Sequence, residues 1–131
     1  MSTEPNATEL AVLKVLWSEE ALSAREVHTQ IGEAQGWSYS TTRTVLQRMV
    51  DKGLATKSSV HGLSVFGAAD RKVDLISRLV RSFAARVLEA DPTALPASTF
   101  AGSRLLDEAE QAELDALLKA GPSSETQEET K

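Results

Sequence analysis

The chain has 131 residues, 41% of them hydrophobic and 25% charged, which fits one ordinary globular domain or one domain with an appendage. Its formal net charge is −5, and it has no cysteine, which excludes disulfides, zinc fingers and thiolate metal sites. No apolar run reaches the roughly 18 residues of a membrane span, and MSTEPNATEL does not resemble a signal peptide, so we expect a cytoplasmic protein that is not inserted in a membrane.

Two consecutive helices are predicted at the start of the chain. Asn6 and Glu9 have the spacing of an N-terminal capping box, and Ser23 and Glu26 repeat it. Gly36 is the left-handed stop expected after the second helix. The apolar residues of the first helix recur at helical spacing: Leu10, Leu13, Leu16 and Trp17.

A third helix and a hairpin follow. The helix is predicted from its cap at Ser38 to about Lys52, with Gly53 as the stop. The next segment, LATKSSVHGLSVFGAA, is rich in Thr, Ser and Val and predicts a β-hairpin with its turn at residues 60–62. Three short helices followed by a hairpin form a winged helix-turn-helix, which we assign to residues 1–69. The inward stripe of the third helix is expected to comprise Val45, Leu46, Met49 and Val50.

The remainder is predicted to be a helical dimerisation region, residues 70–120, and a disordered acidic tail, residues 121–131. One helix is expected over about residues 71–89, and another begins at a third capping box, Asp107 and Glu110. The expected fold class is therefore mainly α with a small β-hairpin: a winged helix-turn-helix head plus a C-terminal helical region. The residues expected at a homodimer interface are Ile76, Leu79, Val80, Phe83, Val87, Leu88, Leu114, Leu117 and Leu118.

The charge is unevenly distributed along the chain. Residues 1–33 carry a net −4, residues 34–82 a net +5 and residues 83–131 a net −6. A basic block on an acidic chain indicates an anionic partner for that block, although a basic solvated surface would give the same pattern.

The third helix has the side chains of a recognition helix, which faces base edges with its N-terminal half. Ser40, Arg43 and Thr44 are expected to face the major groove together, and Arg fits the edge of guanine. Residues further along the helix are expected at phosphates, and the hairpin at the backbone or an adjacent minor groove. The full expected set is Tyr39, Ser40, Thr41, Arg43, Thr44, Arg48, Lys52, Lys57 and His61.

Four segments, ELAVLKVLW, SAREVHTQI, STTRTVLQRMVDKGL and RLVRSF, resemble the BlaI/MecI/CopY family of bacterial repressors, the penicillinase-repressor type. The most specific match is T-x-R-T-x-x-x-R, from Thr41 to Arg48. The resemblance implies a homodimer on a palindromic double-stranded DNA operator. It also implies that Thr41 and Arg43 read bases and that Ser40, Thr44 and Arg48 make neighbouring DNA contacts.

The resemblance also bears on induction. Members that control β-lactamase genes are inactivated by a cut in the C-terminal region, commonly at an Asn-Phe bond, which implies a membrane-bound sensor metalloprotease as a partner. The matching position here is Thr99–Phe100, where the Asn is replaced and two prolines lie nearby. A simpler interpretation is that Phe100 belongs to the dimer interface. The copper-sensing branch uses C-terminal cysteines, which this chain lacks.

Nothing in the sequence indicates an enzyme or a cofactor, because no nucleophile–base pair and no glycine-rich phosphate loop occurs. His28 is expected on the surface or in packing. The alternative function is a winged-helix protein–protein interaction module without specific DNA binding, which the acidic pI near 5.0 leaves open.

Overall fold

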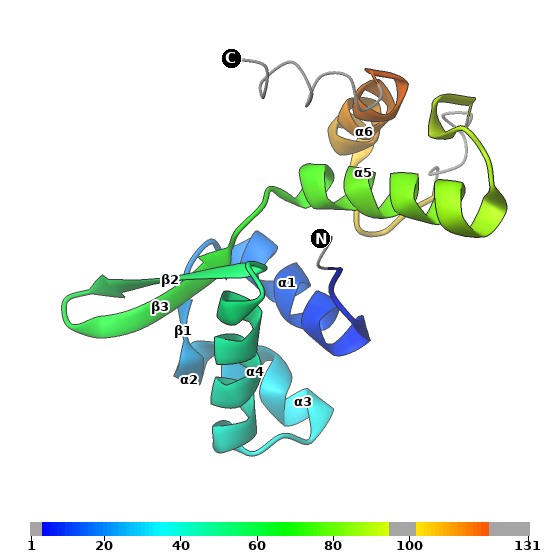
Figure 1. Cartoon of the computed structure of the whole chain (residues 1–131). Helices are drawn as coiled ribbons and strands as arrows, with labels where there is room; N and C mark the ends of the chain where they lie inside the picture. Colours follow the sequence, from blue (N-terminus) through cyan, green and yellow to red (C-terminus); the bar gives the residue numbers. More distant parts are fainter. Residues whose placement is uncertain (1–3, 95–101, 121–131) are drawn as a thin grey trace, which may run out of the picture. The chain divides into compact units, whose positions relative to one another are not determined.

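The computed structural model describes residues 4–94 and 102–120 and divides the chain into two compact units, Met1–Arg71 and Lys72–Lys131 (Figure 1). The bond proposed for cleavage, Thr99–Phe100, and the expected tail, residues 121–131, lie outside the described residues. In the described part, no helix is long and apolar enough to cross a bilayer, and no group of three His, Asp or Glu residues could hold a metal ion.

Helix α1 (Ala7–Glu19) begins at the predicted capping box. The Asn6 side chain accepts a hydrogen bond from the Glu9 amide at 2.8 Å, and the Glu9 carboxylate accepts one from the Asn6 amide at 3.0 Å. Trp17 is half-buried, and its Nε1 donates to the Asp70 carbonyl at 3.1 Å. The fully buried face contains Val12, which the predicted stripe omitted, together with Leu13 and Leu16.

The second predicted helix is present, but its middle turn is π-helical and not α-helical. It comprises α2 (Ala24–Val27), a π-helical turn, η1 (His28–Gly32), and α3 (Glu33–Gln35). Its Ser23–Glu26 capping box and its left-handed end at Gly36, φ +79°, are as predicted. In the π-helical turn His28 Nδ1 lies 2.7 Å from Thr42 Oγ1, in the interior of the unit. The predicted helix carried no signal for this turn.

Helix α4 (Tyr39–Asp51) begins at the Ser38 cap and is followed by Gly53 at φ +82°, both as predicted. Its buried face is rotated slightly from the predicted stripe. Thr42, Leu46 and Met49 are fully buried, whereas the flanking valines at 45 and 50 are only partly covered. A threonine takes an inward place because His28 satisfies its hydroxyl.

The hairpin forms the wing. Strands β2 (Ala55–Val60) and β3 (Leu63–Ala68) are antiparallel, and His61 and Gly62 between them have φ +53° and +79°. Positive φ at both turn residues is what a two-residue type I′ turn requires. A short strand, β1 (Leu22–Ser23), pairs with β3 and completes a sheet of order β1-β3-β2. The expected winged helix-turn-helix head is confirmed, with one strand more than predicted.

The C-terminal unit is helical. Helix α5 (Lys72–Phe83) continues into a π-helical turn, η2 (Ala84–Leu88), which ends at Glu89 with φ +53°. A short 3-10 turn, η3 (Pro92–Ala94), and helix α6 (Glu108–Ala120) complete it. Helix α6 begins at the predicted Asp107–Glu110 capping box. The core of the unit comprises Val73, Leu106, Leu114 and Leu118, with Ile76, Val80 and Leu117 packed against it.

The replacement Gly32→Ala tests the junction of the second helix and α4. Glycine-to-alanine changes inside helices normally stabilise, by up to about 1 kcal/mol. Here a Cβ would overlap His28 Nδ1 and Thr42 Oγ1. We expect the free energy of unfolding to fall by about 1–3 kcal/mol in urea denaturation, the range for overpacking. The exposed neighbour Gln30→Ala is the control and should stay within about 0.5 kcal/mol of the parent. A stabilised Gly32→Ala protein would contradict this packing.

Candidate nucleic-acid interface

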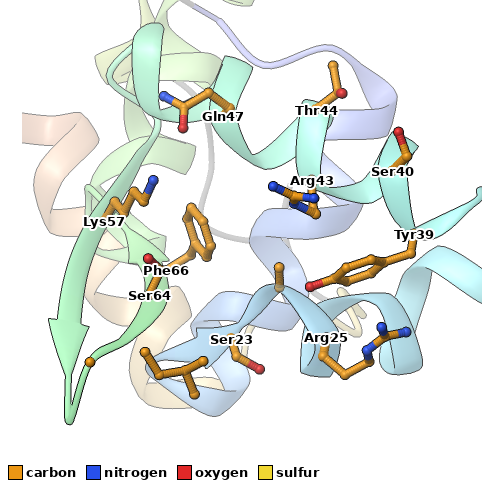
Figure 2. A pocket seen from close by; sticks show the side chains of 13 residues that line it. Ser23, Arg25, Tyr39, Ser40, Arg43, Thr44, Gln47, Lys57, Ser64 and Phe66 are labelled. Atoms are coloured by element: carbon orange, nitrogen blue, oxygen red, sulfur yellow. The ribbon is translucent and has the colours of Figure 1, made fainter.

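An open groove of about 730 Å³ lies between the start of α4 and the wing (Figure 2). Helix α2 contributes one wall through Arg25, α4 another, and β2 and β3 the third. Most of the lining residues are cations, hydroxyl residues or aromatic rings, and the others are Ala24, Gln47, Gly62 and Leu63. The cations are Arg25, Arg43 and Lys57, and the aromatic rings are Tyr39 and Phe66. The hydroxyl groups belong to Ser23, Ser40, Thr44, Ser64 and Tyr39.

Helix α4 presents one face to this groove because its other face is buried. Ser40, Arg43, Thr44 and Gln47 stand at i, i+3, i+4 and i+7, the spacing of one helical stripe. The first three were expected to lie together, and the structure places them in one groove. Gln47 was missed, although its spacing of four from Arg43 could have identified it. Its amide nitrogen donates to Asp51 Oδ1 at 3.0 Å.

The groove carries positive charge that no acidic side chain of the described residues neutralises. No aspartate or glutamate lines it. Within residues 4–94 and 102–120, Arg25, Arg43 and Lys57 have no carboxylate partner within 4.0 Å. On a chain of net charge −5, three unpaired cations around one hollow form a site for an anion.

The aromatic rings lie beside the cations. The Arg25 guanidinium carbon lies 3.8 Å from the centroid of the Tyr39 ring, and that of Arg43 lies 5.8 Å from the same centroid. The Lys57 ammonium lies 5.9 Å from the Phe66 centroid. These contacts hold long, flexible side chains near the groove without a neutralising charge.

Comparison with known proteins shows the family of the chain. The sequence matches the penicillinase repressor family over residues 6–120, which is most of the chain. The chain belongs to the penicillinase repressor family. It is 36% identical over 45 residues to the penicillinase repressor of Bacillus licheniformis, a match that covers 34% of this chain and only about a third, 35%, of that relative. The matched family is one of transcriptional repressors, which are DNA-binding regulators and not enzymes.

Four of the residues expected at DNA lie outside the groove lining: Thr41, Arg48, Lys52 and His61. Thr41 is exposed next to the helix start, where its Oγ1 accepts from Ser38 Oγ at 3.0 Å. Arg48 is exposed further along α4, and His61 is exposed at the wing tip. The wing tip also exposes two apolar side chains, Val60 and Leu63, which pair across the strands.

Lys52 has a role in the fold that the sequence analysis did not foresee. Its Nζ donates to both carboxylate oxygens of Glu9, at 2.7 and 2.9 Å. The Glu9 side chain is only 3% exposed, so its charge needs a partner inside the protein. Since the ammonium is engaged there, we no longer count Lys52 among the phosphate contacts of the repressor.

The residues expected at a dimer interface fall into three groups by exposure. Leu114 and Leu118 are buried within the C-terminal unit of a single chain. Phe83, Val87 and Leu88 are 51%, 58% and 54% exposed. The others are partly buried: Ile76, Leu79, Val80 and Leu117.

Stability measurements distinguish Lys52, which has a structural role, from Arg48, which is exposed and makes no ion pair among the described residues. Lys52→Ala leaves the buried Glu9 carboxylate without its counterion, and we expect a loss of about 1–3 kcal/mol of unfolding free energy, discounted because Lys52 is itself 31% exposed. Arg48→Ala removes an exposed cation one turn away and should change stability by less than about 0.5 kcal/mol. Equal stabilities in chemical denaturation would show that the ion pair does not support the fold.

Proposed function

We propose that this repressor acts as a homodimer in the cytoplasm and binds a palindromic operator, with the groove of each subunit seated on one half-site. The observation that carries the proposal is the unneutralised charge of Arg25, Arg43 and Lys57 around the N-terminal half of α4. A duplex offers one phosphate charge per about 1.7 Å of its length, and phosphate contacts supply much of the affinity of such complexes.

Sequence selectivity is assigned to the outward stripe of α4. Arg43 fits O6 and N7 of guanine in bidentate fashion, and the amide of Gln47 fits adenine. The short hydroxyl side chains of Ser40 and Thr44 allow close approach to base edges. The wing, through Lys57 and His61, is assigned to the DNA backbone, and Arg48 and Thr41 to the flanks of the recognition helix.

Dimerisation is assigned to the exposed apolar residues at the end of α5 and in η2. Phe83, Val87 and Leu88 would leave an apolar patch on a monomer, which soluble proteins rarely tolerate. A two-fold pair of heads requires half-sites one or more helical turns apart.

Release from the operator is assigned to proteolysis between Thr99 and Phe100 by a membrane-bound sensor metalloprotease. The support is the sequence resemblance alone, which implies that Thr99–Phe100 stands at the position of the Asn-Phe bond, with the Asn replaced and two prolines nearby. The alternative for Phe100, a place in the dimer interface, predicts that the full chain resists such a protease. Incubating the chain with membranes that carry the sensor would separate the two.

Arg43→Ala tests the proposal most simply. We expect selection from a random duplex pool to recover a two-fold-symmetric operator for the parent chain. Against that operator Arg43→Ala should lose about 1–3 kcal/mol of binding free energy, and its preference over random DNA should fall. Lys14→Ala, which removes an exposed cation outside the groove, is the control for net charge. Weak, salt-insensitive DNA binding by the parent would instead favour a protein-interaction module.

Phe83→Asp tests the dimer. Because Phe83 is half-exposed, the chain should fold, but a charge in the centre of an apolar interface should separate the subunits. We expect the parent chain to sediment as a dimer at micromolar concentration and Phe83→Asp as a monomer. Ala85→Asp, at an exposed position on the same segment, is the matched control. A monomeric parent would refute this part of the proposal.

A further inference from the structure

One tyrosine ring organises two of the three cations in the groove. The ring of Tyr39, the first residue of α4, lies against the Arg25 guanidinium from α2 at 3.8 Å and near that of Arg43 at 5.8 Å. Figure 2 shows Tyr39 between these two arginines. Arg25 was not among the residues expected at DNA from the sequence, and Tyr39 was expected to touch DNA directly.

We propose that Tyr39 is a shared platform that positions both guanidinium groups, so that Arg25 binds a backbone phosphate beside the base pair read by Arg43. Tyr39 is then a positioning residue, and Arg25 a phosphate-binding residue that α2 adds to the recognition surface. The inference rests on the proposed function and adds a site and a division of roles to it.

The chemistry of guanidinium permits both contacts at once. Its flat face stacks on an aromatic ring, while its N–H donors point outward in the plane of the group. Arg25 can therefore remain on Tyr39 and still donate to a phosphate through its edge, in the charge-assisted manner that suits phosphate oxygens. A side chain already held against a ring loses less rotamer freedom on binding than a free arginine does.

The platform is anchored in the core. The His28 ring meets the Tyr39 ring edge-on, with centroids 5.7 Å apart and planes at 76°. His28 is only 8% exposed, and its Nδ1 lies 2.7 Å from the fully buried Thr42 hydroxyl. The orientation of Tyr39 is thus set by side chains that cannot move without disturbing the interior of the head.

The arrangement also places two like charges beside one ring, without a carboxylate partner among the described residues. Both guanidinium carbons lie within 6 Å of one ring centroid, and among the residues described neither group has a carboxylate partner. An anion beside them relieves the repulsion. In contact with a duplex, the phosphate backbone supplies that anion.

The experiment measures binding of the full chain to the selected operator and to random DNA over a range of salt concentrations. Arg25→Ala should weaken both complexes by the same factor and reduce the slope of log K against log salt by about 0.9, the value for one phosphate. Its preference for the operator should stay unchanged. Lys14→Ala, with the same change of net charge outside the groove, should leave the slope as it is.

Tyr39 is tested with two variants. Tyr39→Leu removes the ring that positions both arginines. Through Arg43 it should lower the preference for the operator about two- to fivefold, the effect of one exposed cation–π contact. Through Arg25 it should also weaken binding to both the operator and random DNA. Tyr39→Phe keeps the ring and should match the parent. Thermal unfolding of each variant confirms that the head remains folded.

The outcomes distinguish a failure of the roles given to Arg25 and Tyr39 from a failure of the proposed function. Suppose that Arg43→Ala loses its preference for the operator, while Arg25→Ala has the same affinity and the same salt slope as Lys14→Ala. The phosphate site at Arg25 is then refuted, and the proposed function stands. If Tyr39→Phe loses as much operator preference as Tyr39→Leu, the tyrosine hydroxyl contacts DNA and the platform is refuted. If the parent itself shows no operator preference, both the inference and the proposed function fall.

Discussion

The buried hydrogen bond between His28 and Thr42 is the constraint on which the DNA-facing surface depends. It joins the π-helical turn of the second helix to the inward face of α4 at 2.7 Å, where Gly32 leaves room for it. With Thr42, Leu46 and Met49 buried on one side, the rotation of α4 is fixed. The stripe that contains Arg43 then faces the groove as a consequence of packing, and the edge contact of His28 places the ring of Tyr39 beside it.

The distribution of charge gives this surface its partner. Two carboxylates of the head make contacts within the fold: Glu9 in a capping box and an ion pair with Lys52, and Glu26 in another capping box. Among the described residues no carboxylate lines the groove or pairs with its cations, although the chain as a whole is acidic. An acidic chain with a basic groove binds polyanions there and repels them elsewhere, which favours docking in one orientation.

Much of the fold could be predicted because its signals are local. The three capping boxes, the left-handed glycines at 36 and 53 and the hairpin turn each depend on neighbouring residues, and each appears in the structure. The features that escaped prediction depend on distant partners. Strand β1 has two residues and is defined by its pairing with β3, and the π-helical turn contains His28, whose partner Thr42 is fourteen residues away.

The same distinction applies to the candidate site. The stripe of Ser40, Arg43 and Thr44 follows from helical spacing alone, and the structure places all three in the groove. Lys52 was assigned to DNA because nothing in its sequence neighbourhood shows that Glu9, 43 residues earlier, takes its charge. Arg25 was overlooked because its proximity to Tyr39 arises only when α2 and α4 pack together.

We propose that the groove between α4 and the wing is the surface that binds operator DNA. The most direct measurement is an NMR titration of the full chain with a duplex recovered from a random pool, following each backbone amide. We expect the largest chemical-shift changes at the amides of residues 39–47 and 57–64, and smaller changes at the start of α2. Changes confined to α5 and α6, with the groove unaffected, would contradict the proposal.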